Sequence, residues 1–183
     1  MKSIKKQWDK LFSHGFSYRR KFRYNPNVSG KILDLGSGQG NSDLEKCGEV
    51  IYTDISNELK KGIQCDAVNL PFKDNSFDYV TSFAMIHHIP RYKLKKLYKE
   101  IDRVSRKGWY LTYAEILNEK SKKYKIIGTI TNRTYYNHSE KDILTEFKKS
   151  KIKKGHKSKN KINYLVGNKI KQDYITNKII VND

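Results

Sequence analysis

Three glycines alternate over five positions of the segment KILDLGSGQG, at Gly36, Gly38 and Gly40. Glycine loses more backbone freedom on folding than any other residue, so it is used where the chain turns sharply or a ligand approaches the backbone. Asp34 precedes the glycines, and Asp54 follows Gly36 by 18 residues. A carboxylate placed there can accept hydrogen bonds from both hydroxyls of a ribose. The spacing indicates a ribose-containing ligand, although a loop built for structural reasons alone would also use glycines.

The segments around these residues predict strands that alternate with helices. Strands are predicted at residues 31–35, 49–56, 63–68, 76–86 and 108–116. Apolar residues at helical spacing predict an amphipathic helix from Arg91 to Arg106. Other helices are predicted at 3–13, 41–46, 118–125 and 139–149, and a closing hairpin is predicted around residues 155–160. This alternation predicts an α/β fold with a mostly parallel sheet, helices on both faces, and ligands at the carboxyl ends of the strands.

Two interpretations compete for the glycine loop, a dinucleotide site and a site for S-adenosylmethionine (SAM). The dinucleotide fingerprint G-x-G-x-x-G requires a third glycine where this chain has Asn41. The glycines here follow the pattern G-x-G-x-G instead, and a second acid, Asp66, comes just before AVNLPFKDNSFDYV. These features favour SAM.

The runs ILDLGSGQG, YTDIS, CDAVNLPFKDNSFDYVTSFAMIHHI and LYKEIDRVSRKGWYLTYAE resemble the class I SAM-dependent methyltransferases. The similarity is to their ubiquinone-methylase-like branch, methyltransferase type 11, and it covers about residues 30–115. It implies a Rossmann-like fold with a mostly parallel seven-stranded sheet, and SAM as the cofactor. Two features depart from the family: the segment between Asp54 and Asp66 is short, and RKGW replaces the usual second glycine before the fifth strand.

The resemblance also assigns cofactor contacts by position. The three alternating glycines would face the methionine and ribose part of SAM, while Asp34 braces their loop. Asp54 would bind the ribose, Asp66 would face the adenine amino group, and Phe83 would line the methionine side.

Three further segments, SFAMIHHI, WYLTYAE and NRTYYNHSEKDILTEF, resemble the eukaryotic tRNA wobble-uridine methyltransferase that esterifies a 5-carboxymethyl group. Glu115 and Asn137 stand where that subfamily has an aromatic residue and a histidine. The resemblance implies a tRNA substrate and a small zinc-binding activator protein that pairs with the third strand. Two alternatives remain open: a small-molecule methyltransferase of quinone or metabolite type, and a non-catalytic module that binds SAM or RNA.

The candidate catalytic residues follow from the chemistry of the acceptor. A carboxylate is already ionised at neutral pH and needs donors that orient it, whereas an amine or hydroxyl acceptor needs a general base. His87 and His88 fit either role, or they brace the loop. Arg19 and Arg133 are candidates for holding a carboxylate or phosphate, as are their neighbours Arg20 and Arg23.

The charge is distributed unevenly along the chain. The net charge is +19, with +8 in residues 1–31, −5 in residues 32–90 and +16 in residues 91–183. An acidic centre suits the cationic groups of SAM, and basic flanks suit tRNA or another RNA. A lysine-, asparagine- and isoleucine-rich proteome is the alternative explanation of the flanks.

These observations predict three parts: a basic, aromatic N-terminal helix and lid at 1–30, a methyltransferase domain at 31–167, and a basic tail at 168–183. Of the N-terminal aromatics, Trp8 and Phe12 are expected to pack the first helix onto the sheet, and Tyr18 and Tyr24 are candidates for a lid or for base stacking. The two cysteines have no metal-ligand spacing, so no metal site is expected. Without a signal peptide or an apolar span, we expect a cytoplasmic protein with no membrane partner.

Overall fold

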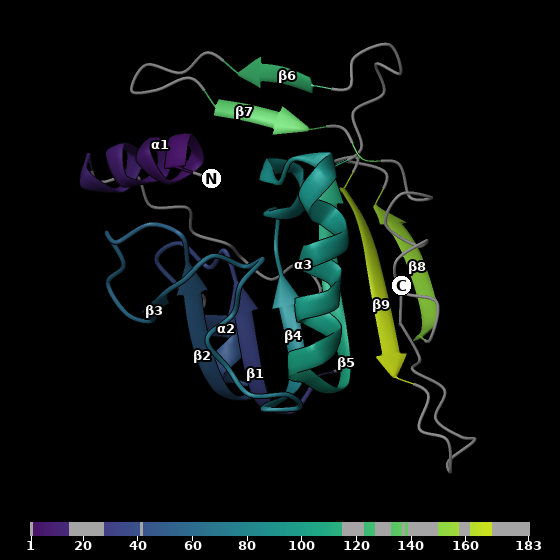
Figure 1. Cartoon of the computed structure of the whole chain (residues 1–183). Coiled ribbons are helices and arrows are strands. Elements are labelled where there is room, and N and C mark those ends of the chain that lie inside the picture. Colours follow the sequence, from purple (N-terminus) through teal and green to yellow (C-terminus); the bar gives the residue numbers. More distant parts are fainter. Residues whose placement is uncertain are drawn as a thin grey trace.

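Seven strands form one sheet in the order β3-β2-β1-β4-β5-β9-β8 (Figure 1). The computed structural model describes residues 2–14, 28–40, 42–114, 123–126, 133–136, 138, 150–157 and 162–169. The strands are β1 (Gly30–Leu35), β2 (Gly48–Asp54), β3 (Ile63–Gln64), β4 (Phe77–Ser82), β5 (Ser105–Ala114), β8 (Ser150–Lys157) and β9 (Ile162–Lys169). Strands β1 to β5 pair in parallel, and β9 pairs antiparallel with both β5 and β8. The predicted Rossmann-like fold is confirmed.

Helices cover both faces of this sheet. The elements are α1 (Lys2–Ser13), α2 (Ser42–Glu45), the 3₁₀ helix η1 (Ile86–His88) and α3 (Arg91–Val104). On one face, α3 buries Leu94, Leu97, Tyr98, Ile101 and Val104. On the other face, Leu44 of α2 packs in a smaller cluster with Ile32 and Tyr110. The predicted amphipathic helix is therefore confirmed, and each fully buried large side chain contributes roughly 1.5–3 kcal/mol.

Three predicted elements differ from the structure. Residues 123–125 were predicted to be helical, but they belong to β6 (Lys123–Ile126), which pairs with β7 (Arg133–Tyr136) in a separate two-stranded sheet. The third strand is two residues long, because the chain turns at Asp66. The fourth strand ends at Ser82 and gives way to η1. The predicted helix at 139–149 lies outside the described residues, and so do residues 118–122.

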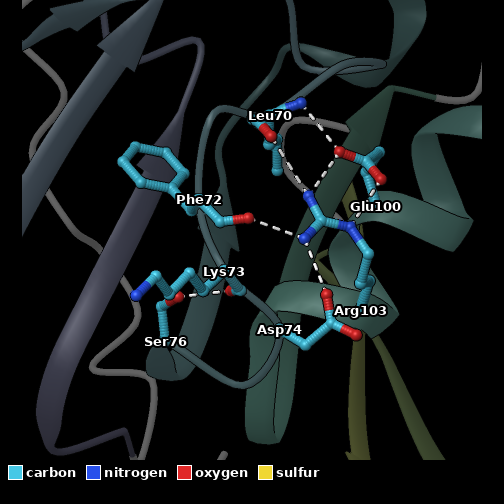
Figure 2. Close-up of polar contacts among 7 residues, drawn as sticks. All are labelled: Leu70, Phe72, Lys73, Asp74, Ser76, Glu100 and Arg103. Atoms are coloured by element: carbon cyan, nitrogen blue, oxygen red, sulfur yellow. Dashed lines mark hydrogen bonds and ion pairs between the residues drawn. The ribbon is translucent and has the colours of Figure 1, made fainter.

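The stretch LPFKDNS leads into β4 in the connection from β3, and Arg103 of α3 holds it in place (Figure 2). The guanidinium donates hydrogen bonds to the carbonyls of Leu70 (3.1 Å) and Phe72 (2.6 Å). It also pairs with Asp74 (2.9 Å) and Glu100 (2.8 Å), and Glu100 accepts a hydrogen bond from the Leu70 N–H (2.7 Å). The hydrogen bond from Arg103 lowers the pKa of the Glu100 carboxyl. This stretch has a structural role, since these contacts fix the loop to α3.

No helix within the described part of the chain is long and apolar enough to cross a membrane.

Candidate SAM site

The glycine loop follows β1 and has a backbone that other residues rarely adopt. The φ angles are +63° at Gly36, +58° at Gly38 and +87° at Gly40. A Cβ added at Gly36 would lie 2.4 Å from Met85 Cγ, and one at Gly38 would lie 3.3 Å from Phe12 Cζ. Left-handed backbone is strained for residues that carry a Cβ, so both the conformation and the space require glycine here.

Asp34 lies beneath this loop. Its side chain is fully buried near the end of β1, where Oδ1 accepts a hydrogen bond from Thr81 Oγ1 of β4 (2.9 Å). The Asp34 carbonyl accepts a second hydrogen bond, from Thr53 Oγ1 of β2 (3.0 Å). Asp34 thus joins three adjacent strands directly below the glycines, which is the position that the predicted bracing role requires.

Asp54 ends β2 and is 8% exposed. Its Oδ2 accepts a hydrogen bond from the Gly38 N–H (2.9 Å), and its Oδ1 accepts one from the Ser56 N–H (3.0 Å). A carboxylate offers about four acceptor sites, so these two bonds are compatible with further hydrogen bonds from ribose hydroxyls. The geometry places Asp54 against the glycine loop, where the resemblance locates the ribose.

Asp66 lies beyond the end of β3, on the same edge of the sheet. The Cys65 N–H donates to the Asp54 carbonyl (2.9 Å), which brings the segment that carries Asp66 next to the end of β2. Asp66 Oδ1 accepts a hydrogen bond from the Val68 N–H (3.2 Å), and its carbonyl accepts one from the Asn69 N–H (2.8 Å). The residue therefore shapes the turn at the position predicted to face the adenine.

Phe83 follows β4, as expected from the sequence, and its ring lies 5.5 Å from that of Tyr110. It packs against the apolar cluster on the α2 side of the sheet. Its neighbour Ala84 has φ +54°, a strained value for a residue with a Cβ, and its N–H donates to Thr112 Oγ1 (2.9 Å). The sequence carries no signal for this kink, which turns the chain into η1.

The two candidate histidines lie in η1 at the same edge of the sheet. His87 and His88 are each 7% exposed, and their ring centroids are 4.4 Å apart. Trp8 of α1 meets the His88 ring edge-on at 5.1 Å. Sequence analysis missed His138, which is buried and whose Nε2 hydrogen-bonds the Ile89 carbonyl at 2.9 Å. The only available signal was its place in the segment RTYYNHSE, directly after Asn137.

Helix α1 is joined to the loop after Asp54. The Asp9 carboxylate accepts hydrogen bonds from Ser56 Oγ (2.7 Å) and the Asn57 N–H (3.1 Å). Burial raises the pKa of Asp9, but the hydrogen bonds from Lys5, Ser56 and Asn57 outweigh it and leave the pKa below its usual value. Trp8 packs on Phe12 at 5.5 Å, consistent with the expectation that both pack the helix onto the domain.

The remaining predicted site residues are placed only in part. Arg133 is the first residue of β7, which contacts η1. Arg19, its arginine neighbours and Tyr18 and Tyr24 lie outside the described residues, as do Glu115 and Asn137. Within the described ranges no group of three or more His, Cys, Asp or Glu side chains could hold a metal ion.

Comparison with known families finds a match in the central part of the chain. Residues 33–112 match the family model described as "Methyltransferase domain". A putative methyltransferase of Encephalitozoon cuniculi is 35% identical, over 42% of this chain and 40% of its own length. Demethylmenaquinone methyltransferase of Staphylococcus saprophyticus is 32% identical, over 62% of this chain and 59% of its own. Probable tRNA methyltransferase 9B of Mus musculus is 27% identical, over 58% of this chain and 26% of its own. The chain thus spans less than two thirds of the length of these relatives.

Solved structures support the fold. The PH0226 protein of Pyrococcus horikoshii has a TM-score of 0.65 at 18% identity, covering 93% of this chain and 92% of its own. A SAM-dependent methyltransferase of Methanosarcina mazei has a TM-score of 0.58 at 17% identity, covering 84% and 99%. DhpI, solved with SAM, has a TM-score of 0.63 at 14% identity, covering 77% and 79%. The described sheet has the fold of these SAM-dependent methyltransferases, and residues 33–112 match the methyltransferase domain model.

Proposed function

We propose that this protein is a SAM-dependent methyltransferase that acts on tRNA in the cytoplasm and esterifies the carboxylate of a 5-carboxymethyl wobble uridine. The observation that carries the cofactor assignment is the glycine loop with its three positive φ angles, held by the buried Asp54 carboxylate. When bound, SAM supplies an electrophilic methyl group on a sulfonium.

The residues at this edge of the sheet suit that cofactor. Asp54 and Asp66 supply carboxylate acceptors for hydroxyl and amino groups, and the acids Asp34 and Asp54 create a negative environment for a cationic ligand. The glycines let the ligand approach the backbone at Gly38, whose N–H is already oriented by Asp54.

The proposed acceptor needs orientation more than proton removal. A carboxymethyl group with a pKa near 4 is ionised at neutral pH, so the side chains need only position it and exclude water. The buried pair His87 and His88 is suited to this role beneath Trp8. The basic flanks and the similarity to a probable tRNA methyltransferase support an RNA substrate.

A quinone-type acceptor is the second candidate. The similarity to demethylmenaquinone methyltransferase extends over more of this chain, and at higher identity, than the similarity to the tRNA relative. Methylation of a ring carbon requires loss of a proton, and in that case His87 or His88 would act as general base.

We also propose that β3 pairs with a small zinc-binding activator. This strand lies at one edge of the sheet, and Ile63 in it is 42% exposed. The proposal predicts that the purified chain has little activity alone and gains activity when a protein of that class is added. Full turnover by the chain alone would contradict it.

The substrate assignment is tested by incubating the protein, together with an activator of the proposed class, with methyl-labelled SAM and tRNA that carries the carboxymethyl group. The expected product is a labelled nucleoside that mild alkali demethylates, because an ester is cleaved while N- and C-methyl groups survive. The rate at subsaturating tRNA is expected to be flat above about pH 6, and His87→Gln and His88→Gln should reduce turnover without shifting that profile. The second candidate would be established by two results. The label would be found on a quinone and resist alkali, and the rate would rise with pH in the wild type but not in one of the two histidine variants.

A further inference from the structure

One side of α3 combines cations with an exposed aromatic ring. The helix buries its apolar residues against the sheet, and its exposed positions are Arg91, Tyr92, Lys95, Lys96 and Lys99. Residues three and four apart lie on the same helix face, so these five form one stripe, here called the α3 basic face. The exposed positions of this helix include no carboxylate.

This arrangement is unfavourable for the helix itself. Arg91, Lys95 and Lys99 follow one another at intervals of four, where like charges repel. The first turn contains no acidic residue, and Pro90 at the N-cap makes no side-chain capping hydrogen bond, although a helix N-terminus favours negative charge. An ordinary solvated helix mixes the two signs of charge. A same-sign face that destabilises its own helix indicates an anionic partner.

The acids of α3 lie outside its exposed positions, although Lys96 of the face acts electrostatically on Glu100. Glu100 is engaged by Arg103 and by the Leu70 N–H on the side of the LPFKDNS loop (Figure 2). Asp102 is half-buried. Lys95 and Lys99 of the α3 basic face are exposed and lie one helical turn apart, so their positive charge is presented to solvent.

Tyr92 points to the kind of anion. Its side chain is 79% exposed, and among the described residues Ile63 is the other exposed large hydrophobic one. Tyr92 stands at the start of α3, four residues after His88, and α3 begins at the end of the sheet where the candidate site lies (Figure 1). An exposed ring beside a line of cations is the combination that binds single-stranded nucleic acid, by base stacking and phosphate contacts.

We infer that the α3 basic face binds the phosphate backbone of the RNA substrate, and that Tyr92 stacks on a base next to the acceptor nucleotide. The inference rests on the proposed function, because it takes the acceptor to be part of an RNA. Phosphates along α3 would lead the strand toward His87 and His88 at the helix start.

The test compares the full chain with two double variants that lose equal charge. Lys95→Ala with Lys99→Ala removes two members of the face, whereas Lys46→Ala with Lys73→Ala removes two exposed lysines elsewhere. Fluorescence anisotropy with labelled tRNA is measured as a function of salt. The first variant is expected to bind on the order of tenfold more weakly at about 0.1 M salt and to reduce the slope of log K against log salt by about 1.4–1.8. The second variant should change the affinity and the salt slope by less than half as much. Neither variant should change SAM affinity.

Tyr92 is tested separately, because stacking does not release counterions. Tyr92→Ala should weaken tRNA binding by about fivefold or more while the salt slope stays the same. Tyr92→Trp should retain the affinity, since tryptophan also stacks.

Equal losses of tRNA affinity in the two lysine variants would overturn the inference, because lysines anywhere on the surface would then contribute equally to binding. Binding of the wild type to anionic vesicles but not to tRNA would also overturn it. Unchanged KM for tRNA methylation in Lys95→Ala with Lys99→Ala would refute the inference and leave the proposed function standing. A methylated quinone as the product would refute the proposed substrate and the role of this face in binding it, and the predicted loss of tRNA binding would then show an RNA-binding surface unconnected with the methyl acceptor.

Discussion

The two ends of the parallel strands hold buried carboxylates in different ways. At the amino end, Asp78 of β4 accepts a hydrogen bond from the Lys31 N–H (2.9 Å) and pairs with Arg106 (2.6 Å) and Lys107 (3.0 Å). Burial raises the pKa of Asp78, but the bonds from Arg106, the Lys31 N–H and Lys107 outweigh it and hold the pKa far below its usual value. At the carboxyl end, Asp54 accepts hydrogen bonds from backbone N–H groups in the loops. The first acid is part of an ion cluster, and the second organises a loop.

The glycines at the two ends of the strands also differ in which atoms surround them. At the amino end, a Cβ on Gly48 would lie 2.1 Å from the Gly30 carbonyl oxygen, so two backbones touch. At the carboxyl end, the nearest atoms to a Cβ on Gly38 or Gly40 belong to the side chains of Phe12 and Lys61. Side chains can move aside and a paired backbone cannot. The contact at Gly48 is therefore fixed by strand pairing, whereas a ligand can approach Gly38 and Gly40 when these side chains shift.

The largest effect is expected for Gly48→Ala. The added methyl must separate β1 from β2 at a position with φ +148°, so we expect a loss of more than about 3 kcal/mol in the free energy of unfolding. Urea denaturation measures this loss. The fraction that remains folded should bind SAM with wild-type affinity, whereas weakened SAM binding without a stability loss would contradict the distinction between the two ends.

Asp54→Ala tests the opposite end. The change removes the acceptor for the Gly38 and Ser56 N–H groups and the proposed acceptor for the ribose hydroxyls, so SAM binding should weaken by about 1.5–3 kcal/mol. Calorimetric titration with SAM gives this value. Asp43→Asn in α2, where the half-buried carboxylate pairs with Lys46, is the matched control and should leave the affinity unchanged.

Asp78→Asn should change the dependence of stability on pH. A carboxyl whose pKa is lowered in the folded state stabilises the fold above its unfolded pKa of about 3.9 and loses that contribution as pH falls below it. Because Arg106 and Lys107 are half-exposed and screened, the effect at neutral pH should be about 1–2 kcal/mol. Thermal unfolding between pH 3 and pH 7 should show a flatter acid limb in the variant, and parallel curves would refute this role of Asp78.

The smallest effect is expected for Asp9→Asn. The variant weakens the bonds that join α1 to Ser56 and Asn57, at a cost of about 1 kcal/mol. Hydrogen exchange should become faster in α1 and not in α3. If α1 is part of the cofactor site, SAM affinity will fall by a few fold, whereas an unchanged affinity would restrict α1 to a packing role.

The parts of this fold that were predictable carry local signals. The glycine loop, the acid at the end of β2 and the apolar spacing of α3 each follow from residue type and position. The helix predicted at 118–125 was wrong at residues 123–125, because lysine-rich sequence favours helix locally while pairing with β7 determines the strand. The kink at Ala84 and the contact between His138 and Ile89 depend on residues distant in the chain, so no local pattern indicates them.

The central claim is that the carboxyl edge of the sheet binds SAM. Calorimetric titration of the purified chain with SAM and, separately, with NADH tests it most directly. We predict one SAM site per chain, weakened by Asp54→Ala, and no measurable NADH binding. Binding of NADH without binding of SAM would contradict the account.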